Sequence, residues 1–200
     1  MGRIPARVGI IAAALTAVVP IAGAQPVGRG VELVGTVQFV TGLTPLTTAT
    51  GRHVLGHVGA RIEGGLQISA TSLVLGIRGW EVRDTSYDAH GADIFLALSR
   101  RLSGSNRTAI RASLSAGSDR LATRQTDGNS RAYHDGSAFS VGIEHELPLW
   151  TERMVVSADL LFPSVDDNPF HRGSPVLEFG IGLRARHVQT IGPVLRARAR

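Results

Sequence analysis

Eight stretches of the chain alternate apolar and polar residues with a period of two, which is the spacing of side chains along a β-strand. In the second stretch, Val54, Val58 and Ile62 share one face, whereas Arg61 and Glu63 share the other. A soluble barrel carries its charges on the outside, but here charged and small residues lie mid-strand on the minority face. This pattern predicts a barrel with a lipid-facing outer wall and a polar interior.

The predicted strands cover residues 31–41, 53–63, 69–82, 92–102, 108–118, 137–147, 154–162 and 176–186. Their length, about 9 to 14 residues, suits tilted strands that cross a bilayer, which need about 9 to 11. Long polar connections (42–52, 83–91, 119–136 and 163–175) alternate with short ones (64–68, 103–107 and 148–153). The predicted fold class is therefore all-β, an antiparallel up-and-down eight-stranded transmembrane β-barrel with a polar lumen.

The first residues predict export. Arg3 and Arg7 precede an apolar run at 8–19, and the small residues Ala22, Gly23 and Ala24 follow. This order is that of a secretory signal peptide, residues 1–24, with cleavage between Ala24 and Gln25. An uncleaved anchor fits less well, because the run is short against the about 20 apolar residues of a spanning helix. The barrel domain is then 25–186, followed by a basic periplasmic tail, 187–200.

Composition limits the possible partners. The chain has no cysteine, so stability after export must come from sheet closure and burial rather than from disulfides. The formal net charge of +5 falls to +3 when the two arginines of the signal peptide leave. This charge is too small to indicate nucleic-acid binding, and export also argues against a nucleic-acid partner. We expect a monomer.

In strand number and facing pattern, residues 31–186 resemble the small eight-stranded bacterial outer-membrane barrels of the outer membrane protein A and X type. The resemblance implies a place in the cell outer membrane, contact with outer-membrane lipids and lipopolysaccharide, and recognition by the outer-membrane assembly machinery. It also implies a structural or loop-mediated surface-interaction role, without an open pore or catalysis. Candidates for the aromatic girdles are Phe39, Trp80, Phe139, Trp150, Phe162 and Phe179.

The chain departs from that family at its end. Such barrels commonly finish on an aromatic residue, whereas this chain continues past Arg186 to an arginine-rich tail. Either the tail is a periplasmic extension or the predicted end of the last strand is wrong.

Charged residues on the predicted inward faces must share a narrow lumen. Because isolated buried charges are costly, we expect arginines to pair with carboxylates there. A structural network is favoured over a selectivity lining or proton path, since eight strands leave room for little more than side chains. The predicted network consists of Arg61, Glu63, Arg78, Arg101, Arg111, Glu144, Glu146, Asp159, Glu178 and Arg184.

No metal or cofactor site is predicted. His53 and His57 share a face, but four residues of strand separate their Cα atoms by about 13 Å, too far for one ion. Residues 180–185 match the glycine spacing of the dinucleotide fingerprint, but they lie in a predicted strand that no helix follows.

Two alternatives to a non-enzymatic membrane barrel stay open. The first is a lipid A-modifying enzyme of the outer membrane, although the nearest serine and histidine, Ser140 and His145, fall on opposite strand faces. The second is a secreted, soluble, calycin-like barrel that binds an apolar ligand. Residues 120–136, rich in Asp, Asn and Arg, are a candidate for surface interactions, and a solvated loop without a dedicated partner is an equally open interpretation.

Overall fold

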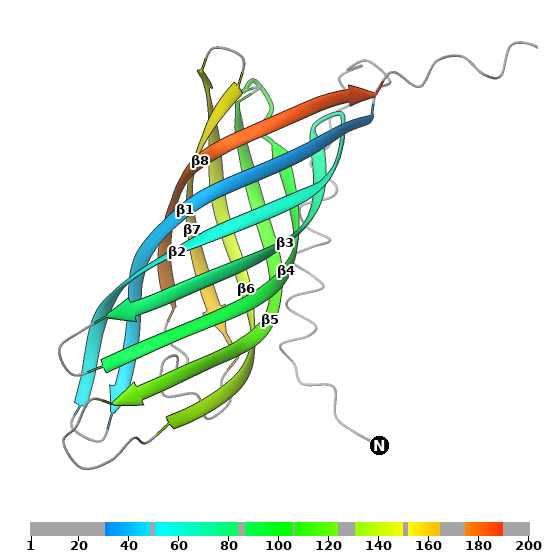
Figure 1. Ribbon diagram of the computed structural model, residues 1–200. Helices are drawn as coiled ribbons and strands as arrows, with labels where there is room; N and C mark the ends of the chain where they lie inside the picture. The colour runs from blue at the N-terminus through cyan, green and yellow to red at the C-terminus, as the bar shows by residue number, and fades with distance from the viewer. Residues whose placement is uncertain are drawn as a thin grey trace, which may run out of the picture.

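The computed structural model describes residues 31–48, 51–83, 87–105, 107–123, 131–149, 152–164 and 175–189. In these residues every strand pairs antiparallel with the next, and the last pairs with the first, so the sheet closes into a barrel (Figure 1). No helix in the described ranges is long and apolar enough to span a membrane. The strands are β1 (Val31–Thr48), β2 (Gly51–Ile68), β3 (Thr71–Arg83), β4 (Tyr87–Arg101), β5 (Thr108–Thr123), β6 (Arg131–Leu149), β7 (Glu152–Pro163) and β8 (Val176–Gln189).

This closed eight-stranded barrel confirms the predicted fold class, including the side on which each face lies. Val54, Leu75 and Ile94 point outward and are 67%, 63% and 60% exposed. Arg111 and Glu144 point inward and are 1% exposed each. An apolar exterior around a charged interior is the arrangement of a barrel whose solvent is lipid.

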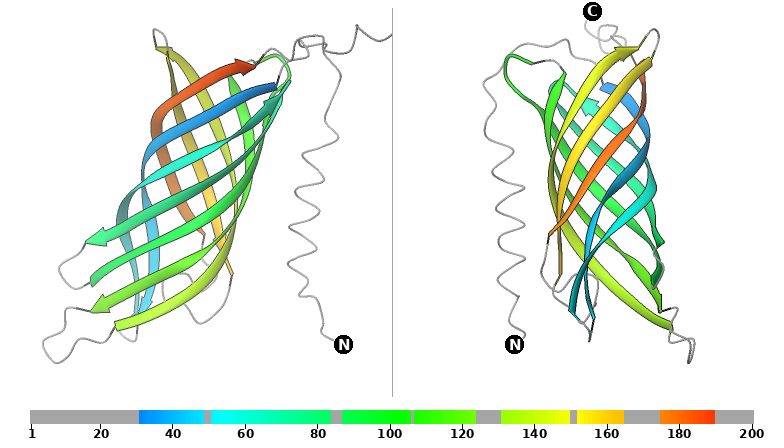
Figure 2. Two further views of the ribbon diagram at one scale, coloured as in Figure 1. Left: turned by 45° about the vertical axis from the view of Figure 1, so that its right-hand side comes forward. Right: turned by 90° about the vertical axis from the view of Figure 1, so that its left-hand side faces the viewer.

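The two ends of the barrel differ in what they carry. Val31 lies opposite Gln189, so β1 begins where β8 ends, at the same end as the connections 69–70, 102–107 and 150–151 (Figure 2). We call this the terminus end and the opposite one the far end. Residues 1–30 and 190–200, which include the predicted signal peptide and most of the tail, lie outside the described residues. β8 continues three residues beyond the predicted end at Arg186.

The far-end connections are shorter than predicted, because the strands are longer. The segment 42–52 is not a loop: β1 continues to Thr48 and β2 starts at Gly51. Likewise β3 and β4 leave only 84–86 between them, and β5 and β6 leave 124–130. Pro45 is accommodated within β1 because β1 pairs with β8 only up to Leu43. Beyond that residue β1 is an edge strand, where a missing backbone N–H costs no ladder bond.

The predicted turn at 64–68 is also wrong. Gly64 and Gly65 continue β2, and the chain turns at 69–70, where Ser69 takes a left-handed φ of 55°. Gly65 marks a close approach of strands, since a Cβ there would lie 2.0 Å from the carbonyl oxygen of Leu73. A glycine inside a strand commonly has this role.

An apolar layer crosses the interior near the far end. Leu46, Val82 and Ala89 are fully buried, with Leu55 and Trp80 packed against them. Trp80 therefore faces the lumen and does not belong to an outer aromatic girdle, which corrects that prediction. The other described candidates fit better: Phe39, Phe162 and Phe179 are 54%, 42% and 49% exposed, and Phe139 stacks on Phe162 with ring centroids 6.3 Å apart.

Candidate functional site: the charged lumen

The ten charged residues predicted for the lumen all come from inward positions, and the structure brings nine of them into ion pairs. These residues and their partners form two ion-pair networks along the barrel. The terminus-side network consists of Glu32, Glu63, Arg111, Glu144, Glu146, Arg153, Arg184 and Arg186. The central network consists of His57, Arg61, Arg78, Asp93, Asp159 and Glu178.

Arg111 and Arg184 hold the terminus-side network together. Arg111 donates to Glu63 Oε2 at 2.6 Å and to Glu144 Oε1 at 2.7 Å. Arg184 donates to Glu63 Oε1 at 3.3 Å, to Glu144 Oε2 at 3.1 Å and to Glu146 Oε1 at 2.9 Å. Two guanidinium groups thus bridge the same two carboxylates across four strands. Charges this deeply buried are tolerated because each is paired and hydrogen-bonded.

Arg111 has a further contact that fixes its position. Its guanidinium carbon lies 5.3 Å from the centroid of the inward-facing Phe95 ring. Phe95 packs in turn with Val34, Val74 and Ala97 on the neighbouring walls. A cation over an aromatic face in a desolvated site adds to the attraction of the carboxylates.

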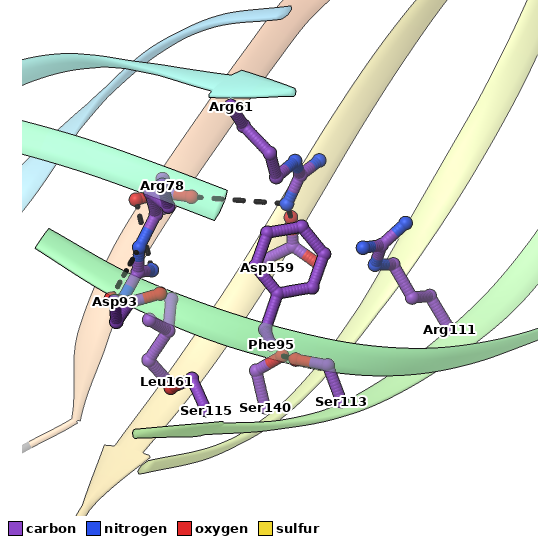
Figure 3. Close-up of a pocket in the computed structure, with 11 residues that line it drawn as sticks. Arg61, Arg78, Asp93, Phe95, Arg111, Ser113, Ser115, Ser140, Asp159 and Leu161 are labelled. Atoms are coloured by element: carbon purple, nitrogen blue, oxygen red, sulfur yellow. Dashed lines mark hydrogen bonds and ion pairs between the residues drawn. The ribbon is translucent and has the colours of Figure 1, made fainter. Parts of the chain in front are cut away.

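The central network spans β2, β3, β4, β7 and β8. Arg61 donates to Asp159 Oδ2 at 2.9 Å and also bonds Gln38 and Ser157. Arg78 donates to Asp93 Oδ2 at 3.0 Å and to Glu178 Oε2 at 3.3 Å. Figure 3 shows Arg61 directed at Asp159, and Arg78 directed at Asp93. In this part of the lumen, too, the arginine guanidinium groups are paired with carboxylates.

His57 joins the central network to its far-end side. Its Nε2 lies 3.4 Å from Glu178 Oε2, and its Nδ1 lies 2.8 Å from the hydroxyl of Thr44. The ring meets Trp80 edge-on at 6.4 Å between centroids. Within the described residues no group of three metal-ligating side chains forms, and His53 and His57 do not constitute one.

Arg101 is the tenth predicted residue and behaves differently. It lies at the end of β4, where its Nη2 donates to the amide oxygen of Gln67 at 3.3 Å. Among the described residues it contacts no carboxylate.

Sequence reasoning missed several members of these networks. Asp93 is not in the predicted network, although it lies directly opposite Arg78 in the β3–β4 pairing. Gln38, directly opposite Arg61, was missed in the same way. At strand ends, alternation alone does not show whether a side chain turns into the lumen. This applies to Glu32, Arg153 and Arg186.

Little space is left inside. The central network borders a cavity of about 10 Å³ (Figure 3), and the terminus-side network borders a second one of about 10 Å³. Each holds about one water molecule. The arrangement is a packed, ion-paired core without room for a solute.

Two hydroxyl–histidine pairs have the residue types of a catalytic site but not its geometry or its access to substrate. Ser140 is buried and bonds Ser113 at 2.6 Å, while His145 bonds Thr108 at 2.9 Å on the outer face, so Ser140 and His145 do not meet. Thr44, His57 and Glu178 have the order of a hydroxyl–imidazole–carboxylate triad. All three are no more than 3% exposed, beneath the apolar layer of Leu46, so a substrate has no access to the hydroxyl.

No protein-family model matches the chain, and no curated protein matches it in sequence. Among solved structures, Ail, the attachment invasion locus protein of Yersinia pestis, matches with a TM-score of 0.58 at 10% identity, covering 80% of this chain and 100% of Ail. Neisserial surface protein A matches with a TM-score of 0.51 at 11% identity, covering 76% of this chain and 96% of that protein. The chain therefore has the fold of the eight-stranded outer-membrane barrels, which confirms the resemblance at the level of fold.

Proposed function

We propose that this protein is a closed outer-membrane barrel that acts through its far-end surface and does not conduct solutes. In this proposal the signal peptide is removed between Ala24 and Gln25, both termini face the periplasm, and the far end faces the outside of the cell. The role is structural or an interaction with a partner at the cell surface. Ail and Neisserial surface protein A share this fold, and the name of Ail refers to attachment and invasion.

The sealed lumen carries this proposal. Three successive layers occupy it: the terminus-side network, the central network and the apolar layer of Leu46, Val82 and Ala89. The cavity that borders each of the two networks is of water size. A porin of about 16 to 18 strands has an aqueous channel instead. With its interior filled, the barrel has only its surfaces left for specific recognition.

Planar-bilayer recording tests the absence of a channel. Purified monomer should give no long-lived conductance steps, and neither should Leu46→Ala, since the two charged layers remain. Stable open states of the unmodified monomer would refute the sealed lumen and favour a channel.

The surface role is tested by shortening the far end. Replacing residues 123–130 with Asn-Gly, a favoured two-residue hairpin turn, keeps the last β5–β6 pair, Ala122 opposite Arg131. The variant should retain heat-modifiable migration on gels but lose adhesion of expressing cells to host-cell or matrix surfaces. A matched control replaces the terminus-end residues 103–106 with a turn of equal length. Equal adhesion of the two variants would contradict a role for this connection.

A further inference from the structure

We propose that the terminus end of the barrel holds a binding site for a phosphate-type oxyanion, formed by the guanidinium groups of Arg101 and Arg107. The inference is independent of the proposed surface role, because it rests on charges and a cavity at the opposite end of the barrel.

The charge balance of the terminus-side network is the first observation. Its arginines and glutamates are equal in number and contact one another throughout: Arg111, Arg153, Arg184 and Arg186 with Glu32, Glu63, Glu144 and Glu146. The network is therefore neutral before Arg101 and Arg107 are counted. Within the described part of the chain neither of these two forms an ion pair with a carboxylate: Arg101 bonds the amide oxygen of Gln67, and Glu146 and Glu32 act on it only at longer range. The two arginines therefore add positive charge to a network that is already neutral.

The two free charges lie at one cavity. Arg101 and Arg107 both line the terminus-side cavity of about 10 Å³, together with Gln67, Ser72 and Ser99. Glu144 and Glu146 line it too, but both carboxylates are engaged by arginines of the terminus-side network. Ala70 and Arg107 place this cavity directly beneath the connections 69–70 and 102–107. Its volume admits one oxygen of an oxyanion, with the remaining oxygens directed toward the exposed Arg107.

Gln67 positions Arg101, which forms the inner half of the site. Its amide nitrogen donates to the carbonyl oxygen of Ser69 at 3.0 Å, and its amide oxygen accepts from Arg101 at 3.3 Å. One amide thus ties the Arg101 guanidinium to the β2–β3 turn and leaves its other N–H groups available. The hydroxyls of Ser72 and Ser99 add donors on the same wall.

The chemistry of the donors selects the ligand. Two guanidinium groups present planar pairs of N–H donors that match tetrahedral oxyanions, and arginine favours phosphate for this reason. Two sources can supply the group, a dissolved phosphate or a phospholipid headgroup. The second is within reach, since Ile68 and Leu102 beside the site are 58% and 41% exposed, so the lipid-facing wall extends to these turns.

The first test uses inorganic phosphate as the probe. The folded mature protein in zwitterionic detergent micelles is titrated with phosphate at constant ionic strength, and binding is followed by phosphorus NMR line broadening and by the Tm. The unmodified protein should show saturable binding and a rise in Tm beyond that given by chloride. R101Q/R107Q should weaken binding at least about tenfold, whereas R52Q, which removes an exposed far-end arginine, should not. Heat-modifiable migration establishes that each variant is folded.

The second test distinguishes the sources. Native mass spectrometry compares retention of phosphatidylglycerol with that of diacylglycerol, which lacks the phosphate. If phosphatidylglycerol is retained by the unmodified protein and lost from R101Q/R107Q, while inorganic phosphate gives no response, the site binds a lipid headgroup. If R101Q fails to fold, R107Q alone answers the question, since that side chain is exposed. If neither probe depends on these arginines, the proposal is wrong.

Discussion

Arg111 Nη2 lies 2.6 Å from Glu63 Oε2, and both side chains are 1% exposed, so β2 and β5 are joined through the middle of the barrel by a fully desolvated ion pair. Removing one partner of such a pair leaves a buried charge uncompensated.

Arg111→Leu should therefore lower the free energy of unfolding by about 3 to 5 kcal/mol, measured by urea unfolding in lipid vesicles. The control R52L, at an exposed arginine outside the networks, should cost little. Adding Glu144→Gln to Arg111→Leu should recover part of the loss, because Glu144 is the other carboxylate that Arg111 contacts. Strictly additive losses would show that the pair is not coupled.

On the outward face, we expect the stability cost of a charged substitution to depend on its depth in the membrane. Ile94 is 60% exposed on the outer wall of β4, and Ile94→Arg should cost about 2 to 4 kcal/mol of stability in bilayers. His90 lies on the same face four residues nearer the far end, opposite Glu81. His90→Arg should cost no more than about 1 kcal/mol, as at a membrane interface. Equal losses of stability at both sites, in the same vesicle assay, would show that the apolar band does not lie where the exposed residues indicate.

Adjacent glycines in β2 provide a steric test. A Cβ at Gly65 would lie 2.0 Å from the carbonyl oxygen of Leu73, whereas one at Gly64 would lie 3.8 Å from that of Val34. Gly65→Val forces the β2–β3 backbone apart and should cost about 1 to 3 kcal/mol or prevent folding. Gly64→Val should be tolerated, with normal heat-modifiable migration. The reverse order would contradict the pairing of Gly65 with Val74.

The predicted cleavage of the signal peptide can be checked from the mass of the mature protein. The protein isolated from the cell envelope should begin at Gln25, and Ala24→Arg should block processing because the cleavage site requires small residues. N-terminal mass spectrometry of both proteins checks this. An intact Met1 in the unmodified envelope protein would refute cleavage.

Alternation of residue types was enough to predict the number of strands, their faces and nine members of the ion-paired lumen. It was enough because lipid outside and a narrow lumen inside impose a period of two on every strand. Strand ends were harder to predict. Pro45 and the pair Gly64 and Gly65 carry turn signals, yet an edge position accommodates the first and close strand contact requires the glycine at 65.

Partner choice within the lumen was likewise beyond the sequence. Arg101 satisfies the same parity rule as Arg111, but its position at the end of β4 gives it Gln67 in place of a carboxylate. Trp80 is aromatic, as girdle residues are, but it is even-numbered on β3 like Val82 and therefore points into the lumen. The partner of Arg101 depends on how strands are offset around the barrel, which single-strand patterns do not contain. The inward position of Trp80 follows from the same alternation that places Arg78 inward.

The pairing of Val31 with Gln189 also determines when this molecule can become stable. The first strand has no second neighbour until the last strand has been made, so a nascent or truncated chain exposes two unpaired edges. Open edges recruit other strands and lead to aggregation. Closure between the two ends of the domain is also the slowest kind of contact to form, because the whole intervening chain must be ordered. The chain must therefore be kept from aggregating until it is complete, and truncation within β8 should be far more damaging than loss of an equal number of far-end residues.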